Sequence, residues 1–282
     1  MKIILTRSPK QNEHLRRGIL ECNMKLLDRD IISLPLLKAE PITPGEMGKQ
    51  TILGLDQFDD IFFISKNAVA FGLDQLEQYW PQWPILLRWF AVGSGTSSAL
   101  GPANVKVSYP HNASSEGLLG MPELEHMAGR KCLIVRGIGG RETLKEGLEA
   151  RGAQVSYLET YQRVPIEFSV AELPQVESNQ PELSQPELSQ AESSHAKLSQ
   201  AESSRPESVE YEEIVALLYS GEALSHFLSR GGANVLQYQL IVPSQRLLIM
   251  ANDLGFAKVE LANSQEDHAM LQVLQQMRRR VS

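Results

Sequence analysis

Five hydroxyl side chains follow short apolar runs, at positions where strands are expected to end. They are Thr6, Ser65, Thr96, Ser220 and Ser244. Any one of them is most simply the N-cap of the next helix, since its oxygen accepts a hydrogen bond from a free backbone N–H group. As a group, such hydroxyls and the neighbouring amides are able to hold carboxylates without a full positive charge. The pattern therefore predicts a binding site for an anionic ligand.

Basic residues lie on or near the same turns, where they would add charge-assisted hydrogen bonds to such a ligand. They are Arg7, Lys66, Arg136, Arg141 and Arg246. Each one taken alone is equally well explained as a solvated surface charge. We assign Arg7, Lys66 and Arg136 to the expected site.

Familiar catalytic motifs are missing from the sequence. It has no G-x-S-x-G elbow, no H-E-x-x-H helix and no P-loop, and its six histidines are scattered. Residues 136–141 resemble a dinucleotide-binding turn, but Glu142 stands where the third glycine is required. Cys22 and Cys132 are far apart and have no partner at metal-ligand spacing, so we expect neither a disulfide nor a metal site. The chain is either a binder or an enzyme that works by shape and hydrogen bonding.

Short apolar runs alternate with helical patterns, which is typical of a mainly parallel α/β sheet. The expected strands are residues 2–6, 60–65, 89–93, 105–109, 131–136, 154–161, 214–220, 240–243 and 257–261. The expected helix starts are Ser65, Ser94, Ser114, Ser220 and Ser264.

The two halves of the sequence contain similar segments. Residues 59–68 resemble 212–223, because each runs from a strand into a serine with an alanine three residues later. Residues 90–96 correspond more loosely to 240–245. We therefore expect two similar α/β domains, with the ligand beyond the carboxyl ends of the strands in an interdomain cleft.

A biased segment, residues 172–210, contains pentapeptides such as PELSQ and almost no aromatic or β-branched residues. We predict a disordered insertion, because this composition cannot bury enough apolar surface to offset chain ordering. A coiled coil is the alternative, but one leucine per five residues with recurrent proline forms no 3.5-residue seam. Eight glutamates against Lys197 and Arg205 give this segment a charge of −6, which leaves −1 of the total −7 for the rest. The folded part is therefore neutral enough to bind an anion.

The whole chain of 282 residues is long enough for two domains. Its acidic balance argues against a protein that binds nucleic acid or an anionic membrane. No segment approaches the roughly 18 to 20 apolar residues that span a bilayer, and the N-terminal apolar run is too short for a signal peptide. We expect a soluble, cytoplasmic protein.

Several segments, in order along the chain, resemble the uroporphyrinogen-III synthase family. They are residues 4–7 (ILTR), 62–69 (FFISKNAV), 91–100 (AVGSGTSSAL), 115–119 (SEGLL), 129–137 (GRKCLIVRG), 148–155 and 161–163 (YQR). Each segment is weak by itself, whereas their order and spacing together are fairly specific. The resemblance covers the chain except for the pentapeptide segment.

This resemblance implies two α/β domains joined by a two-stranded β linker. Domain one would consist of residues 1–36 and 166–282, and domain two of residues 37–165. The linker strands would lie near 34–41 and 158–165. The insertion then follows the point where the chain re-enters domain one.

The reaction implied by the resemblance converts linear hydroxymethylbilane to uroporphyrinogen III. Water is lost, the last pyrrole ring is inverted through a spiro intermediate, and the macrocycle closes. The pyrrole itself supplies the electrons that expel the hydroxyl, so no nucleophile, metal or organic cofactor is implied. The enzyme would be a monomer that receives its substrate from hydroxymethylbilane synthase. Its main task would be to position a flexible octacarboxylate.

Tyr161 matches the tyrosine that the family is proposed to use in assisting departure of the hydroxyl. Ser65, Thr96 and Ser220 match polar positions of the family's cleft. Two departures are Ile64-Ser65 where the family often has Thr-Ser, and Ser244-Gln245 where it has a Thr pair. They affect the expected contacts of individual side chains more than the expected activity.

Two other functions remain open. A non-catalytic two-lobed protein would bind a tetrapyrrole or another small polyanion and leave its isomer ratio unchanged. An interaction scaffold built on the pentapeptide segment would lose its function when residues 176–205 are deleted.

Overall fold

The computed structural model describes residues 1–22, 26–174 and 213–281. Its contacts divide the chain into two units, Met1–Leu37 with Pro165–Ser282 and Lys38–Val164. Most of the predicted insertion lies outside the described residues. Its first residues are described: Glu172 ends a 3₁₀ turn (Val170–Glu172), and Leu173 is buried.

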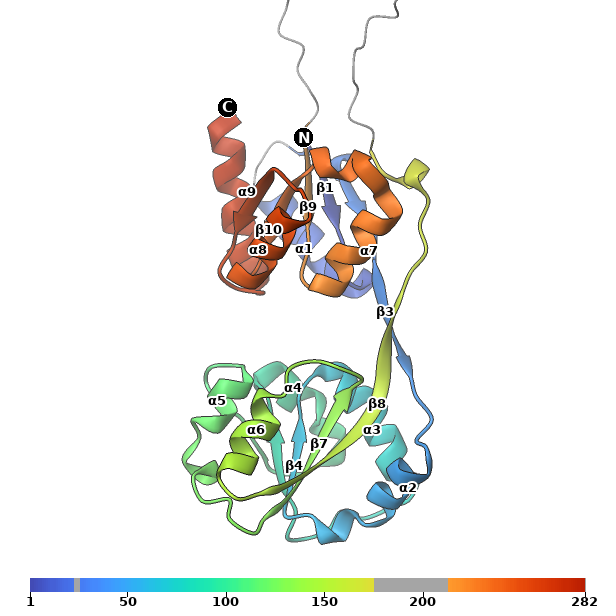
Figure 1. Cartoon of the computed structure of the whole chain (residues 1–282), viewed down its shortest axis with the longest axis vertical. Coiled ribbons are helices and arrows are strands. Elements are labelled where there is room, and N and C mark those ends of the chain that lie inside the picture. The colour runs from blue at the N-terminus through green and yellow to red at the C-terminus, as the bar shows by residue number, and fades with distance from the viewer. Residues whose placement is uncertain (23–25, 175–212, 282) are drawn as a thin grey trace, which may run out of the picture. The chain divides into compact units, whose positions relative to one another are not determined.

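The first unit contains a five-stranded sheet in the order β11-β10-β9-β1-β2, and all four neighbouring pairs are parallel (Figure 1). The strands are β1 (Lys2–Leu5), β2 (Ile31–Ser33), β9 (Ile214–Leu217), β10 (Gln239–Val242) and β11 (Lys258–Leu261). The helices are α1 (Pro9–Glu21), α7 (Gly221–Gly231), α8 (Gln245–Asp253) and α9 (Asp267–Val281), with 3₁₀ turns at Asp28–Asp30 and Gly232–Gln237.

Both faces of this sheet are covered by helices. Ile4 belongs to a core with Phe227 of α7 and Leu247 of α8. Its neighbour Ile3 belongs to a second core with Leu15 of α1 and other residues. Successive side chains of a strand point to opposite faces, so α7 and α8 cover one face, and α1 covers the other.

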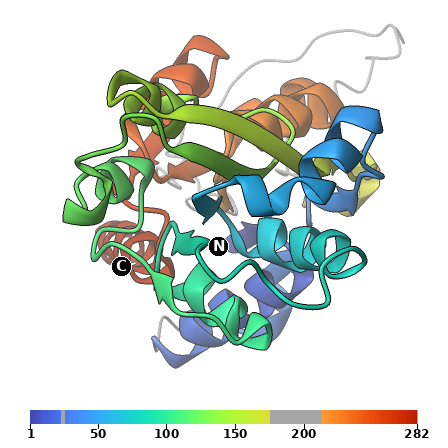
Figure 2. The same ribbon diagram turned by 90° about the horizontal axis from the view of Figure 1, so that it is seen from below.

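The second unit contains a six-stranded sheet in the order β3-β8-β7-β4-β5-β6. The strands are β3 (Leu37–Pro41), β4 (Asp60–Phe63), β5 (Arg88–Ala91), β6 (Val107–Ser108), β7 (Lys131–Gly137) and β8 (Gln154–Pro165). The helices are α2 (Glu46–Leu53), α3 (Lys66–Glu77), α4 (Ser94–Ala99), α5 (Ser115–Leu119) and α6 (Thr143–Ala150), with 3₁₀ turns at Leu55–Gln57, Gly101–Ala103 and Pro122–Leu124. Figure 2 shows β7 and β8 side by side in this sheet.

Parallel pairing extends from β8 to β6, and β3 forms the antiparallel edge. The Ile42 N–H donates to the Thr160 carbonyl (3.0 Å) and the Ile166 N–H to the Leu36 carbonyl (2.9 Å), so the two strands run in opposite directions. Phe63 packs with α3 on one face, and Phe62 packs with α5 and α6 on the other. The predicted fold class, two mostly parallel α/β sheets, is confirmed.

Several details of the predicted elements were wrong. β2 was missed, because only three residues pair there. The strand expected at 105–109 shortens to Val107–Ser108. Ser94 is already helical, and Gly93 is the extended residue before α4. Asn263 has a left-handed backbone (φ 57°), and α9 begins only at Asp267, so Ser264 does not start the helix.

Among the described residues, no helix is both long enough and apolar enough to span a bilayer.

Candidate active site

Ser65 stands between β4 and α3 in an extended conformation (φ −165°, ψ 162°). Its Oγ accepts a hydrogen bond from the Ala68 N–H at 2.9 Å, so it is the predicted N-cap. The cap satisfies one backbone donor of the helix and fixes the serine hydroxyl at the carboxyl end of β4.

Tyr161 is brought to this hydroxyl by the tertiary structure. Its Oη lies 3.1 Å from Ser65 Oγ, although 96 residues separate the two in sequence. The tyrosine is 6% exposed, and its ring packs against Phe71 of α3 with 5.7 Å between ring centroids. Two residues assigned to the site are thus in contact, and Phe71 is a supporting residue that the sequence did not indicate.

Gly137 lies against the Tyr161 ring at the end of β7. A Cβ placed on Gly137 would be 2.6 Å from the ring, closer than real side chains pack. The next residue, Ile138, donates its N–H to the Tyr161 carbonyl at 2.8 Å. Glycine is required here because the ring occupies the space of a side chain. The only sequence signal was the glycine-rich turn, whose pattern suggested dinucleotide binding instead.

Arg136 was assigned to substrate binding, but its buried guanidinium is engaged by the protein itself. Its Nε donates to the Gly137 carbonyl (3.2 Å), Nη1 to Glu142 (2.9 Å), and Nη2 to the Gly139 carbonyl. The guanidinium carbon also lies 4.5 Å from the centroid of the Tyr157 ring. These contacts hold the turn next to Tyr161.

Tyr157 completes this network by donating its hydroxyl to Glu142 Oε2 at 2.5 Å. The hydrogen bonds from Tyr157 and Arg136 lower the pKa of Glu142. Burial, followed by the hydrogen bond to Glu142, raises the pKa of Tyr157 to about 12. At neutral pH the pair is therefore a carboxylate and a neutral phenol.

Lys66, after β4, lies close to the first turn of α4, the helix that follows β5 and contains Thr96. A Cβ on Gly95 would be 2.9 Å from Lys66 Cε, so the lysine side chain passes over the first turn of α4. Lys66 is exposed, whereas Thr96 is 6% exposed and lies inside α4. Lys66 is thus available to a ligand at this edge.

In the first unit, three of the assigned hydroxyls follow the neighbouring strands β1, β9 and β10. Thr6 is buried and donates to the Leu217 carbonyl at 2.5 Å. Ser220 caps α7 by accepting from the Ala223 N–H (3.1 Å), and Ser244 caps α8 by accepting from the Leu247 N–H (3.4 Å). All three lie at the carboxyl edge of the sheet, and Thr6 is engaged by a backbone carbonyl there.

Arg7 lies over the ring of Tyr219, 4.7 Å from its centroid, and donates to Asp267 at 2.8 Å. Burial raises the pKa of Tyr219 to about 12, while the nearby Arg7 opposes this shift. Neither Tyr219 nor Asp267 was predicted. Tyr219 was detectable as an aromatic residue directly before the predicted cap Ser220.

The two remaining basic residues lie on the surface. Arg141 pairs with Glu116 at 2.7 Å, and Arg246 is exposed on α8.

The fold and these residues define a class: an α/β protein of two units, each with hydroxyls and capped helix N-termini at the carboxyl ends of parallel strands. The family model described as uroporphyrinogen-III synthase HemD matches residues 21–272. The uroporphyrinogen-III synthase of Escherichia coli K12 is 32% identical, covering 98% of this chain and 100% of the relative. That of Salmonella typhimurium is 31% identical with the same coverage.

Solved structures share the fold. The uroporphyrinogen-III synthetase of Helicobacter pylori superimposes with a TM-score of 0.55 at 14% identity, covering 98% of this chain and 99% of that one. A mutant uroporphyrinogen III synthase from Thermus thermophilus gives 0.52 at 12% identity, with 98% of each chain covered. The chain belongs to the uroporphyrinogen-III synthase family, as the sequence segments predicted.

Proposed function

We propose that this chain converts hydroxymethylbilane to uroporphyrinogen III, the family's step in tetrapyrrole biosynthesis. It is then a cyclising lyase that acts on a small-molecule substrate. The observation that carries the proposal is the identity above 30% to two synthases along the full length of each relative.

Tyr161 is the proposed acid assistant. Ser65 Oγ already accepts a hydrogen bond from the Ala68 N–H, and its own hydrogen is able to point to Tyr161 Oη. In that arrangement the Tyr161 hydrogen is free to reach the departing hydroxyl of the substrate. The pyrrole supplies the electron pair that breaks the C–O bond, and the hydroxyl leaves as water. A carbon of the last pyrrole ring then attacks the methylene carbon that lost the hydroxyl, and this new bond forms the spiro intermediate.

Binding of the substrate carboxylates is assigned to the carboxyl edges of both sheets. Lys66 is exposed there, and Arg7, Ser65, Ser220 and Ser244 are half-exposed. Arg7 and Arg136 contribute positive charge while paired with Asp267 and Glu142. Thr6 and Thr96 are buried, and the Thr6 hydroxyl donates to the Leu217 carbonyl, so the contribution that we propose for these two residues is to the shape of each edge. Such a site relies on many weak contacts that position the substrate for ring inversion.

The isomer assay tests this function. Purified protein is mixed with freshly generated hydroxymethylbilane, and the oxidised products are separated by chromatography. We expect mainly the type III isomer. The spontaneous type I product alone would overturn the proposal, and tetrapyrrole binding with an unchanged isomer ratio would indicate the non-catalytic binder.

Three finer points are also proposed from the resemblance. The protein acts in the cytoplasm, as a monomer, on substrate released by hydroxymethylbilane synthase. Light scattering of the purified chain tests the monomer, and a larger mass would contradict it.

A further inference from the structure

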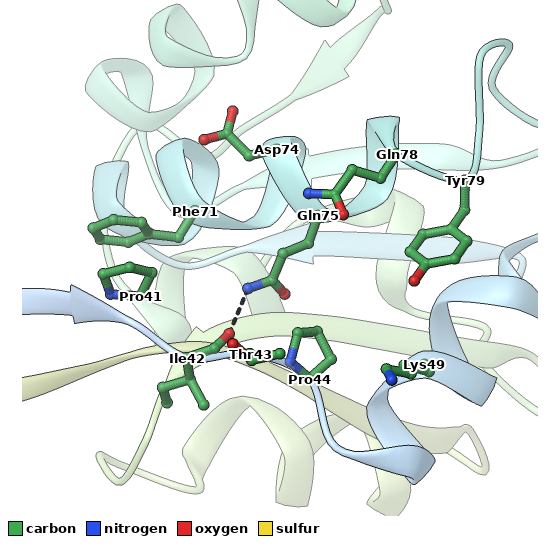
Figure 3. A pocket seen from close by; sticks show the side chains of 10 residues that line it. All are labelled: Pro41, Ile42, Thr43, Pro44, Lys49, Phe71, Asp74, Gln75, Gln78 and Tyr79. Carbon is green, nitrogen blue, oxygen red and sulfur yellow. Dashed lines mark hydrogen bonds between the residues drawn. The ribbon is translucent and has the colours of Figure 1, made fainter.

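A hollow of about 330 Å³ lies in the second unit, between α3 and the segment that follows β3 (Figure 3). Its walls come from residues 41–44, from Lys49 of α2 and from α3 with the turn after it. Gln75, near the middle of this wall, is ten residues beyond the cap Ser65, or about 15 Å along the helix. The hollow thus lies away from the Ser65 cap, although one of its walls, Phe71, also packs against the Tyr161 ring.

Gln75 presents an unused hydrogen-bond acceptor at this hollow. The residue is 9% exposed, and its Nε2 donates to the Ile42 carbonyl at 2.7 Å. This bond fixes the orientation of the Gln75 side-chain amide, because the Ile42 carbonyl can accept a hydrogen bond only from the NH₂ group. The amide oxygen of Gln75, Oε1, is buried and has no hydrogen-bond partner among the described residues. Figure 3 shows it on the side of Pro44. A buried acceptor of this kind costs free energy until a donor reaches it.

Opposite charges border the same hollow. Asp74 lies on α3 and Lys49 on α2, and Figure 3 shows them on opposite sides of Gln75. Neither forms an ion pair with another described residue. Phe71, Pro41 and Pro44 supply apolar walls between them. The lining thus offers an acceptor, a cation, an anion and apolar surface within a small volume.

We propose that this hollow binds a small zwitterion of amino-acid size. The ligand's ammonium group donates to Gln75 Oε1, the acceptor that has no partner among the described residues. Its carboxylate faces Lys49, and its side chain packs against Phe71 and the prolines. The proposed tetrapyrrole substrate does not fit this description: the hollow is small for it, and Asp74 would repel its carboxylates. The proposal does not rest on the proposed function, although the shared Phe71 places the hollow next to Tyr161.

The test titrates the full chain with each of the twenty standard amino acids, up to about 10 mM, by calorimetry or protein-observed NMR. We expect saturable binding of at least one apolar or aromatic member, with one site per chain. Its amine and carboxylic-acid analogues, phenethylamine and 3-phenylpropionate in the case of L-phenylalanine, should bind roughly tenfold more weakly or not at all. Absence of saturable binding by every member of the panel would overturn the proposal.

Single substitutions test whether the amino acid binds in this hollow. Gln75→Met keeps the shape but removes the acceptor, and it should weaken binding by about tenfold or more. Because Gln75 also bonds Ile42, Lys49→Met provides a second test at an exposed position. It should weaken binding of the amino acid and leave the binding of its amine analogue unchanged. Lys106→Met, another exposed lysine of the same unit, is the matched control. Unaltered affinity in both Gln75→Met and Lys49→Met would show that the ligand binds elsewhere and refute the site.

Discussion

The hydroxyl oxygens of Ser65 and Tyr161 lie 3.1 Å apart, one at the start of α3 and the other on β8. Ser65 is held by its cap to Ala68, and Tyr161 is held by Phe71 and by the close approach to Gly137. The phenol is thus oriented before any substrate arrives, as the proton-donating role proposed for Tyr161 requires.

Replacement of Tyr161 by phenylalanine removes only this hydroxyl. We expect turnover in the isomer assay to fall by about a hundredfold. The free energy of unfolding should change by about 1 kcal/mol or less, because one hydrogen bond is lost and the ring stays packed. Tyr109→Phe, at an exposed tyrosine of the same unit, is the control. Full activity of Tyr161→Phe would assign the residue to packing.

Ser65→Ala and Ser114→Ala form a matched pair, since each removes the N-cap of one helix in the second unit. Each should cost about 1 kcal/mol in urea unfolding. Only Ser65→Ala also frees the Tyr161 hydroxyl, so its catalytic rate constant should fall further than that of Ser114→Ala. Equal loss in the two variants would mean that Ser65 acts as a cap alone.

Gly137→Ala places a methyl group where the Tyr161 ring lies. We expect a loss of about 1 to 3 kcal/mol in stability from overpacking. Turnover should fall as well, because the ring must move away from Ser65. Gly101→Ala is the control, since a Cβ there meets no heavy atom within 4 Å. A fully active Gly137→Ala would show that the ring position tolerates displacement.

Glu142 gives a pH-dependent contribution to stability. Its pKa is lowered in the folded protein, so the carboxylate contributes stability above the unfolded value of about 4.3. That contribution is lost as the pH falls through the folded-state pKa. The difference in unfolding free energy between wild type and Glu142→Gln should therefore be present at pH 7 and shrink on acidification. Glu125→Gln, at an exposed glutamate, should show no such trend. A pH-independent difference for Glu142→Gln would contradict the network with Tyr157 and Arg136.

Cys132 should resist alkylation in the native protein. Burial raises the pKa of its thiol to about 12, and the neighbouring Asp60 carboxylate adds to this effect. Since the thiolate is the reactive form, labelling with iodoacetamide at pH 8 should be slow until the chain is denatured. The Cys22→Ser variant isolates this thiol for mass spectrometry. Equally rapid labelling of native and denatured protein would disprove its burial.

Secondary structure was accessible from the sequence where local patterns are strong. Strands such as β4 and β7 each contain an uninterrupted apolar run. Ser65, Ser114 and Ser220 are caps because their short side chains reach the following amides. β2 and the late start of α9 were not predictable. The first depends on pairing with a distant strand, and the second on the left-handed Asn263 and the irregular turn after it.

The sequence by itself determined the α/β class and the positions of hydroxyls at strand ends, because both follow from short-range patterns of apolar and capping residues. It also indicated the family, through segments kept in order along the chain. Only the tertiary structure decided which of these side chains are engaged by the protein itself and which are available to a ligand. It joined Ser65 to Tyr161, enclosed Arg136 among its own acceptors, and left one oxygen of Gln75 without a partner among the described residues. These outcomes depend on contacts between residues far apart in sequence, which local patterns do not encode.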